Sequence, residues 1–405
     1  MPHILFINQH YYPDFAATGQ LLAELCEDLS QKGFRITVIT GYPEKGTYPD
    51  YLTPLKNEQH KNLTIYRIYN HPAGNKSNIN RLFHFFSFWL GSVVKALFMQ
   101  EKYDLIYVMS TPPLLNGITA NLVSFFRGVP YLYNVQDLYP GIAVEMGTLT
   151  NKHIISISQM IENYINQNAL SISTLSVQMK KSISEHAEPN KIVILPNWSD
   201  GNLIRPQKES QLRKKIGLTE MFLVTYSGNM GMSQGLDSLL GVAEILQTEK
   251  PNIHFLFIGN GAHLPELKKI KETNNLKNVT FLPYQPKENL SDSLACADLH
   301  LISTTPNLSK YLMPSKLYGI LAAGKSYLAV TESTSEIVEF TVKESCGVTA
   351  NPGDIEQITS AIIKLEENVD VLQKMGKLGR EVFDKQFERK IVTEKYAAHL
   401  RNILR

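Results

Sequence analysis

The chain has little cysteine, little net charge and no long apolar run. Its 405 residues include three cysteines, Cys26, Cys296 and Cys346, which are far apart and lack the spacing of a metal site. The formal net charge is only +2, so the composition gives no support for nucleic acid as a partner. No run of 18 uncharged apolar residues occurs, and the first residues read as a strand, so we expect no spanning helix and no signal peptide. This composition is typical of a folded protein of a reducing compartment.

Metal-binding patterns are also lacking. No two aspartates lie two positions apart, and the eleven histidines are scattered without ligand spacing. We therefore expect no metal and no cofactor. Phosphate groups would instead be held by backbone amides at helix starts and by lysines.

Short apolar runs alternate with longer helical patterns along the chain. One series of such runs extends from residue 3 to 198, a polar stretch covers 199–217, and a second series extends from 222 to 350. This alternation predicts an α/β protein with two Rossmann-like domains that face a central cleft. The predicted boundaries are 1–198 for the N-terminal domain, 199–385 for the C-terminal domain, and 386–405 for a helix that packs back on the first domain.

Glycine-rich loops follow two predicted strands of the second domain. Their residues are Gly228, Asn229, Gly231, Gly259, Asn260 and Gly261. Ligands of open α/β sheets bind beyond the carboxyl ends of the strands, and amides in such loops can cradle a diphosphate. The first loop resembles G-x-G-x-x-G only loosely, and no acidic residue follows at the spacing that a dinucleotide ribose needs, which argues against a dehydrogenase.

The stretch MPSKLYGILAAGK, residues 313–325, predicts a helix whose start suits an anion. With Pro314 at the first helical position, the amides of Ser315 and Lys316 have no intrahelical partner. The Lys316 ammonium adds a positive charge at the same place. The alternative is an ordinary capped helix with a solvated lysine.

Two loops of the first domain also carry candidate residues. The loop over 9–20 brings Gly19 to the start of a helix, where a backbone can approach a phosphate or a sugar closely. Gln136 and Asp137 follow a predicted strand, and Asp137 could accept a proton or orient a hydroxyl. Capping of the next helix by Asp137 is the alternative.

Residues 82–99 predict a helix with a wide apolar face. His84, Ser87, Gly91 and Lys95 recur at helical spacing, and the rest of the circumference is apolar. One interpretation is a helix packed on its own domain, and the other is a surface that contacts a membrane.

In their order and spacing, these segments resemble the metal-independent GT-B glycosyltransferases of the family-4 type over nearly the whole chain. The segments are VMSTPPLL, VQDLYP, VILPNWSD, YSGNMGMSQGLDSLL, FIGNG, VTFLPYQPKENL and MPSKLYGILAAGK. Within that family the chain resembles the branch that builds surface polysaccharides, with its colanic-acid fucosyltransferase-like and O-antigen aminosugar transferase-like enzymes.

The resemblance implies transfer of a sugar from a GDP- or UDP-sugar donor to a lipid-linked or oligosaccharide acceptor, with retention at the anomeric carbon. It implies acceptor binding in the first domain, donor binding in the second, and a location in the cytoplasm or at the inner face of the plasma membrane. The catalytic candidates are then Asp137, Gln136 and Lys316. The donor-binding candidates are Gly19, Gly228, Asn229, Gly231, Gly259, Asn260, Gly261, Tyr284, Ser315 and Lys316.

The chain departs from the wider family at the positions of its best-known polar residues. Tyr311 and Gly319 stand where the family has two glutamates, and Asn229 and Gln234 stand where it has an arginine and a lysine. A family His-Asp pair is replaced by Gln136 and Asp137. These departures shift the expected diphosphate contact to Lys316, the Ser315 amide and the Gly228 loop.

Two other functions remain open at this stage. A sugar-nucleotide 2-epimerase shares the two-domain architecture, but it needs several proton-transfer groups where this chain offers Asp137. A relative that has lost catalysis and only binds or scaffolds is the other alternative: the missing glutamates leave it open, whereas the retention of several phosphate-suited loops argues against it.

Overall fold

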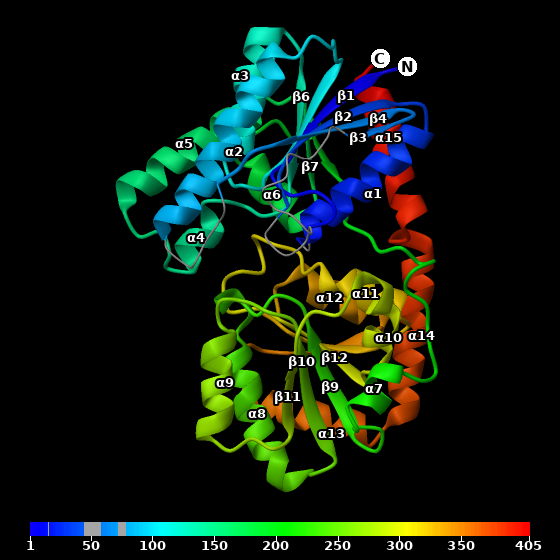
Figure 1. Cartoon of the computed structure of the whole chain (residues 1–405). Helices are drawn as coiled ribbons and strands as arrows, with labels where there is room; N and C mark the ends of the chain where they lie inside the picture. The colour runs from blue at the N-terminus through cyan, green and yellow to red at the C-terminus, as the bar shows by residue number, and fades with distance from the viewer. Residues whose placement is uncertain (15, 44–57, 72–77) are drawn as a thin grey trace. The chain divides into compact units, whose positions relative to one another are not determined.

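The chain forms two compact units in a computed structural model that describes residues 1–14, 16–43, 58–71 and 78–405 (Figure 1). Unit 1 comprises Met1–Pro196 and Val392–Arg405, and unit 2 comprises Asn197–Ile391. The first boundary thus follows residue 196 instead of the predicted 198. The chain returns to unit 1 at residue 392 instead of the predicted 386.

Unit 1 is built on an eight-stranded sheet with the order β3-β4-β2-β1-β5-β6-β7-β8. The strands are β1 His3–Ile7, β2 Arg35–Gly41, β3 Glu58–His60, β4 Leu63–Ile68, β5 Leu105–Met109, β6 Tyr131–Val135, β7 Ser171–Thr174 and β8 Ile192–Ile194. Every pair is parallel except the edge pair of β3 with β4. Strands β1, β5 and β6 are buried along their whole length, which explains their continuous apolar sequences.

Helices cover both faces of this sheet (Figure 1). They are α1 Ala17–Gln31, α2 Asn78–Phe98, α3 Leu115–Arg127, α4 Gly141–Glu145, α5 Lys152–Asn168, α6 Val177–Ser184, the 3-10 turn η1 Pro189–Lys191 and α15 Arg389–Ile403. Parallel crossovers are right-handed, and α1 connects strands in the opposite direction to α2, α3 and α5, so α1 lies on the other face. The C-terminal helix α15 packs near α1, where Lys32 Nζ lies 2.6 Å from Glu394 Oε2.

Unit 2 contains a six-stranded parallel sheet with the order β11-β10-β9-β12-β13-β14. The strands are β9 Phe222–Ser227, β10 Ile253–Ile258, β11 Val279–Leu282, β12 Leu299–Ser303, β13 Tyr327–Val330 and β14 Gly347–Ala350. The helices are α7 Gln211–Lys215, η2 Met232–Gln234, α8 Leu236–Glu249, α9 Leu264–Thr273, η3 Lys287–Asn289, α10 Leu290–Ala295, α11 Lys316–Ala322, α12 Glu336–Glu344, α13 Ile355–Glu366 and α14 Val369–Gln386.

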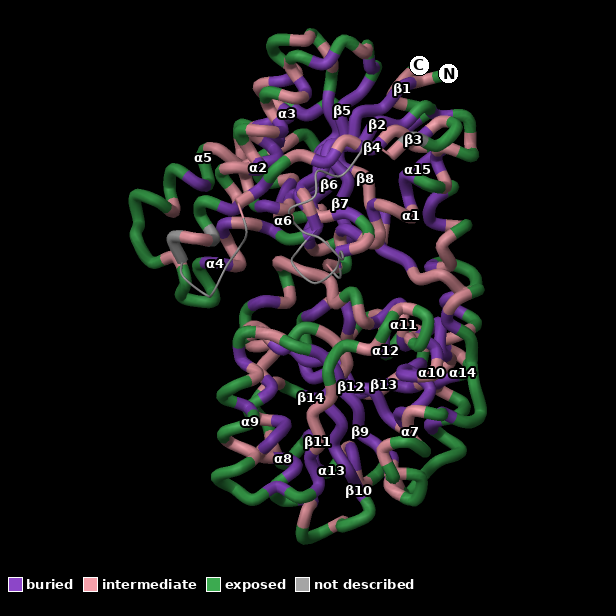
Figure 2. The backbone as a smooth tube through the Cα atoms, viewed as in Figure 1, coloured by how far each residue is buried: buried purple, intermediate pink, exposed green. Residues whose placement is uncertain are grey.

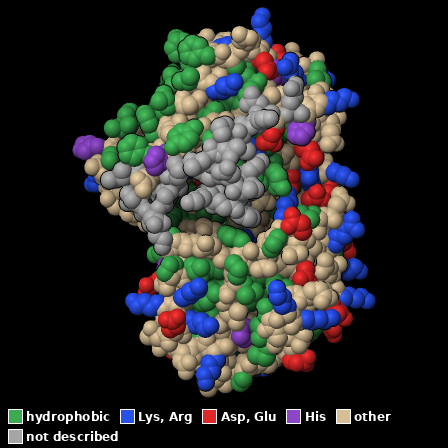
Figure 3. Space-filling model, in the orientation of Figure 1, with side chains coloured by type: hydrophobic (Ala, Val, Ile, Leu, Met, Phe, Trp, Pro, Cys, Tyr) green, Lys and Arg blue, Asp and Glu red, His purple; other side chains and the backbone are tan. Residues whose placement is uncertain are grey.

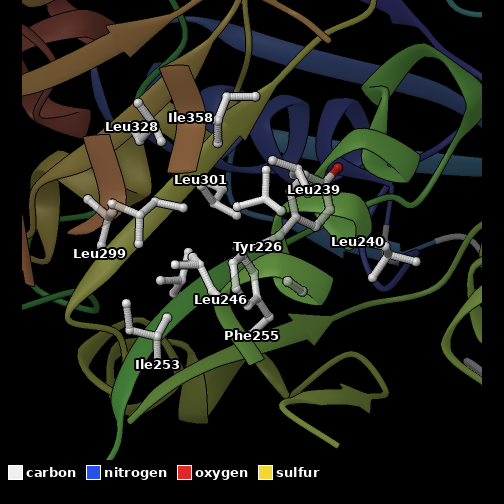
Figure 4. Close-up of a cluster of buried hydrophobic side chains, with 14 of the residues drawn as sticks. Tyr226, Leu239, Leu240, Leu246, Ile253, Phe255, Leu299, Leu301, Leu328 and Ile358 are labelled. Carbon is white, nitrogen blue, oxygen red and sulfur yellow. The ribbon is translucent and has the colours of Figure 1, made fainter. Parts of the chain in front are cut away.

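The core of unit 2 lies on both faces of its sheet, with alternate residues of a strand pointing to opposite sides. Leu328 and Val330 of β13 join a cluster with α8 and α13, whereas Tyr327 and Ala329 join a cluster with α11 and α14. Figure 4 shows the first cluster, in which Tyr226 lies among leucines and isoleucines. The buried colour in Figure 2 follows the strands and the inner faces of the helices.

The predicted α/β class and the two Rossmann-like domains are confirmed. The sequence did not predict β3, because a three-residue edge strand is too short to show a period. Among the described residues, no helix has both the length and the apolar character needed to cross a bilayer.

Candidate functional site

Two glycine loops of unit 2, after β9 and β10, pack backbone against backbone. The Met230 N–H donates to the Asn260 carbonyl at 2.8 Å. A β-carbon on Gly259 would lie 2.0 Å from the Gly228 carbonyl oxygen, and one on Gly261 would lie 2.3 Å from that of Met230. No side chain fits at these distances, so both loops need glycine for their own packing, before any ligand is considered.

Lys316 extends from the start of α11 to the Gly228 loop. A β-carbon on Gly228 would lie 2.6 Å from Lys316 Cε and 3.3 Å from Nζ, so the lysine lies directly against the glycine. Lys316 Nζ donates to Gln234 Oε1 at 3.0 Å and lies 4.8 Å from the centre of the Tyr226 ring. Burial lowers the pKa of Lys316 to about 8. The site therefore presents a cation that is mostly protonated at neutral pH, beside a loop without side-chain bulk.

Tyr284, which follows β11, borders the same loops. Its side chain is 44% exposed, and desolvation raises its pKa while a hydrogen bond with the backbone of Asn260 opposes that rise. The Asn260 side chain accepts from the Gly261 N–H at 2.8 Å. Desolvation is the main cause of the raised pKa of Tyr226, and the neighbouring Tyr284 raises it further. The structure thus brings together Tyr284, Asn260 and the Lys316 region.

Helix α11 begins later than predicted. It starts at Lys316, Ser315 is the N-cap residue without a side-chain hydrogen bond, and Pro314 lies outside the helix. The Leu317 N–H donates to the Pro314 carbonyl at 3.2 Å, so a single tight turn precedes the helix. The placement of Pro314 at the first helical position was therefore wrong. The predicted end is right, because Gly324 follows the last turn with φ of +65°.

Packing does not force glycine at the position of the second family glutamate. A β-carbon on Gly319 would first meet Leu294 Cδ1 at 3.5 Å, an ordinary contact. The departure from the family at this position is therefore a change in polar chemistry and not a steric necessity.

In unit 1, Gln136 is part of a buried hydrogen-bond network. Its Nε2 donates to Asn134 Oδ1 at 2.6 Å, and Asn134 Nδ2 lies 2.8 Å from Ser173 Oγ and 3.3 Å from the Tyr396 hydroxyl of α15. The Gln136 side chain therefore links β6 to β7 and α15.

Asp137, the next residue, is exposed. The protein around it still desolvates the carboxyl and raises its pKa to about 6. It does not cap the next helix, because the N-cap of α4 is Pro140 without a side-chain hydrogen bond. A carboxyl with a raised pKa and access to solvent suits the proton or hydroxyl contact that the sequence suggested.

Gly19 lies in the first turn of α1, in unit 1. A β-carbon there would lie 3.0 Å from the carbonyl carbon of His10 and from the Tyr11 nitrogen. The glycine thus allows the helix start to lie against the loop after β1. The remaining donor-binding candidates all lie in unit 2.

Two short patterns in unit 2 match known motifs in letters but not in structure. Residues 231–235 read Gly-x-Ser-x-Gly, yet Ser233 lies in a 3-10 turn with its Oγ 3.1 Å from Gln234 Nε2. Residues 319–326 read G-x-x-x-x-G-K-S, but here a helix precedes the glycine and a strand follows it, the reverse of a P-loop. Lys325 Nζ donates to the Ala297 carbonyl at 2.8 Å.

Sequence reasoning missed two residues of the site, Gln234 and Tyr226. In the sequence, Gln234 is distinguished only as a departure from the family, and Tyr226 has the pattern of an ordinary strand residue. Their common feature is contact with Lys316, which is distant in sequence. Within the part of the chain that the structure describes, no group of three His, Cys, Asp or Glu side chains could hold a metal ion.

Both units match glycosyltransferase families. Residues 17–198 match the family described as glycosyl transferase 4-like domain, and residues 208–382 match glycosyl transferases group 1. WcaI of Escherichia coli (strain K12), named for glycosyl transfer in colanic acid biosynthesis, is 24% identical, with 98% of this chain and 99% of WcaI covered. WbjE of Pseudomonas aeruginosa, named as a glycosyltransferase, is 23% identical, with 100% and 99% covered.

Solved structures share the fold at low sequence identity. Sucrose-phosphate synthase from Thermosynechococcus elongatus superposes with a TM-score of 0.80 at 17% identity, covering 100% of this chain and 99% of that one. HepE from Anabaena, solved with UDP and glucose, gives a TM-score of 0.75 at 17% identity, covering 99% and 100%.

The fold and the two matched domains define a glycosyltransferase of GT-B architecture. More closely, the chain belongs to the glycosyltransferases in which a 4-like domain precedes a group 1 domain. The family and the enzyme class predicted from the sequence are both confirmed.

Proposed function

We propose that the protein transfers a sugar from a GDP- or UDP-sugar to a lipid-linked or oligosaccharide acceptor during synthesis of a bacterial surface polysaccharide. The reaction retains the anomeric configuration and needs no metal ion. The relative named for colanic acid biosynthesis supports the pathway, and HepE structures with UDP and UDP-glucose support the donor class. The observation that carries the proposal is the Lys316 ammonium held against the Gly228 loop.

The donor binds in unit 2, with its diphosphate beside Gly228 and Lys316 and its base beside Asn260 and Tyr284. Cleavage of the sugar–phosphate bond places negative charge on the leaving diphosphate. A cation that is already fixed in place stabilises that charge without reorganisation, which is commonly the largest single contribution to catalysis. The glycines at 259 and 261 let the loop after β10 pack directly against the Gly228 loop.

In unit 1, Asp137 contacts the acceptor. In a retaining reaction the departing phosphate itself takes the proton of the acceptor hydroxyl, so Asp137 orients the acceptor and is not a dedicated base. Gln136 acts through the buried network that holds this strand end, because its amide nitrogen is bonded to Asn134.

The test is release of nucleoside diphosphate in the presence of donor and a membrane extract that supplies acceptor. Lys316→Ala should lower the rate about a hundredfold, the usual effect of losing one electrostatic contact to the transition state. Lys374→Ala, on the exposed surface of α14, is the matched control and should leave the rate unchanged. Near-normal transfer by folded Lys316→Ala would exclude the diphosphate assignment.

Three further measurements separate the alternatives. Transfer should continue in excess EDTA, and strict dependence on added metal would contradict a metal-free reaction. Conversion of the nucleotide sugar in the absence of acceptor would instead indicate a 2-epimerase. Lack of binding to both UDP and GDP would indicate a relative without catalysis.

We also propose that unit 1 contacts the inner face of the plasma membrane through α2 and its neighbours. One side of α2 is buried and contains His84, Phe88 and Ser92, and the His84 Nδ1 lies 2.5 Å from the His71 carbonyl. The opposite side faces solvent and is apolar. The exposed residues are Leu82, Phe83, Phe86, Leu90, Val94 and Phe98. An apolar stripe turned toward solvent is typical of a surface that another apolar phase covers.

The apolar surface continues over α3 and α5, as Figure 3 shows. Phe125 and Phe126 are 82% and 66% exposed, and a groove of about 460 Å³ lies between the two helices. The groove residues are Ile118, Asn121, Leu122, Phe125, Ile157, Met160, Ile161, Tyr164 and Ile165.

The charge of these three helices fits an anionic membrane. Lys95, Arg127 and Lys152 lie on them, and Glu162 is the one acidic residue in their sequences. Desolvation raises the pKa of Glu162 to about 8, so this carboxyl is mostly neutral at pH 7. Basic side chains around an apolar surface attract anionic lipid headgroups.

Flotation with anionic vesicles tests the contact. Val94→Asp should abolish flotation, whereas Val342→Asp, at a still more exposed valine on α12 of unit 2, should not. Equal flotation of the two variants would exclude this surface as the contact.

A further inference from the structure

We infer that Gln234 is a positioning residue whose side-chain oxygen fixes the Lys316 ammonium against the Gly228 loop. The inference rests on the proposed function for the identity of the ligand, a nucleoside diphosphate. The contact itself stands on the geometry of unit 2 alone.

The orientation of the Gln234 amide follows from its partners. Lys316 is a hydrogen-bond donor only, so the atom that faces its Nζ at 3.0 Å must be Oε1. The same oxygen lies 3.0 Å from the Tyr226 hydroxyl, and the amide nitrogen donates to Ser233 Oγ at 3.1 Å. Both ends of the amide are thus engaged.

The backbone around Gln234 is also fixed. Its N–H donates to the Gly231 carbonyl at 3.2 Å within the 3-10 turn η2, and Gly235 follows with φ of +58°. The Ser233 carbonyl accepts from the Thr305 N–H at 3.0 Å, which ties the turn to the loop after β12. Gln234 therefore has little freedom to follow Lys316, whereas the long lysine side chain depends on Gln234 for its place.

The chemistry of a carboxamide suits this position. Its oxygen stabilises the partly buried ammonium without cancelling the charge that a diphosphate needs. A glutamate would pair with Lys316 and repel the diphosphate, and a second lysine about 3 Å away would favour loss of the proton from one of the two ammonium groups. The titratable neighbours are Tyr226 and, beside it, Tyr284, and burial raises the pKa of both, so neither is charged near pH 8.

The test is the titration of Lys316 in the ligand-free protein, followed by NMR of ¹³C-labelled lysine side chains and assigned with Lys316→Met. The wild-type pKa should be near 8. Gln234→Leu removes the acceptor and should lower this pKa by about 1, the scale of one hydrogen bond to a charged group. Gln234→Glu adds a negative charge and should raise it. Gln373→Leu, the same change on the exposed surface of α14, should leave it at the wild-type value.

If Gln234 only held the loop in place, the Lys316 pKa would not move in opposite directions in Gln234→Leu and Gln234→Glu. An unchanged pKa in both Gln234 variants would overturn the inference. Calorimetry with UDP and GDP supplies the second readout: Gln234→Leu should bind about tenfold more weakly at pH 8 than wild type, with a smaller loss at pH 6.5. If the pKa values move as stated but wild type binds neither nucleotide, the positioning role holds and the proposed function fails.

Discussion

Gly228→Ala should lower both the stability of the protein and its affinity for nucleotide. The two effects have different causes, the backbone conformation at residue 228 and the position of Lys316, and can be measured separately. Gly228 has φ of +141°, a region that costs residues with a side chain about 1–3 kcal/mol. The new methyl would also lie 2.6 Å from Lys316 Cε. Because Cε belongs to the far end of a flexible side chain, the lysine moves aside and the collision itself costs little stability.

The main effect of displacing the Lys316 ammonium should be a loss of affinity for the nucleotide. A charged hydrogen bond contributes about 1.5–3 kcal/mol, which corresponds to a loss of roughly tenfold to a hundredfold in affinity for UDP or GDP. Urea denaturation measures the first effect, and isothermal titration calorimetry measures the second. Gly241→Ala, inside α8, is the control, because its φ is not positive and its β-carbon would meet only the flexible end of the Ile355 side chain, Cδ1, at 3.2 Å.

A double-mutant cycle decides whether the binding loss acts through Lys316. Once Lys316 is replaced by alanine, Gly228→Ala should cost little further affinity, because the contact that it disturbs is already lost. Full additivity of the two losses would refute the reasoning, as would normal nucleotide affinity in Gly228→Ala.

Two further predictions concern stability. Lys316→Met should unfold at a higher temperature than wild type at pH 7. The pKa of Lys316 in the folded protein, about 8, lies below the usual value of 10.5, so burial of the ammonium lowers the stability of the wild type in full below pH 8. The difference in melting temperature between the two proteins should shrink as the pH rises from 8 toward 10.5. A difference in melting temperature that does not narrow as the pH rises would contradict this prediction. Phe88→Asp should destabilise the protein by about 4 kcal/mol or more, since Phe88 is fully buried, whereas Phe86→Asp at a 52% exposed position should change stability little; similar melting curves would show that the assigned face of α2 is wrong.

The sequence predicted most of the fold because the strands lie between two layers of helices. Strands such as β1 and β10, buried along their whole length, appear as continuous apolar runs that a single sequence reveals. Helix α2 shows the limit of such reasoning. Its spacing of polar residues does not say which side faces the sheet, whereas the structure shows that His84, bonded to the His71 carbonyl, and Ser92 lie inward.

The site was predicted in part for a similar reason. Gly228 and Lys316 could be selected because each follows a strand, at the edge where ligands of α/β sheets bind. The contact of Lys316 with Gln234 joins residues 82 positions apart, and no local pattern encodes it. The backbone packing that requires Gly259 and Gly261 is likewise invisible in a sequence, where the same glycines suggest only a phosphate loop.

The central claim is that Lys316 provides the charge that holds the donor diphosphate without a metal ion. Calorimetric titration of UDP and GDP into wild type and Lys316→Met, at pH 7 in excess EDTA, tests it most directly. We predict that at least one nucleotide binds wild type, and that the variant binds it about a hundredfold more weakly while remaining folded. Equal affinity in the two proteins, or binding that appears only after a divalent metal is added, would contradict the account.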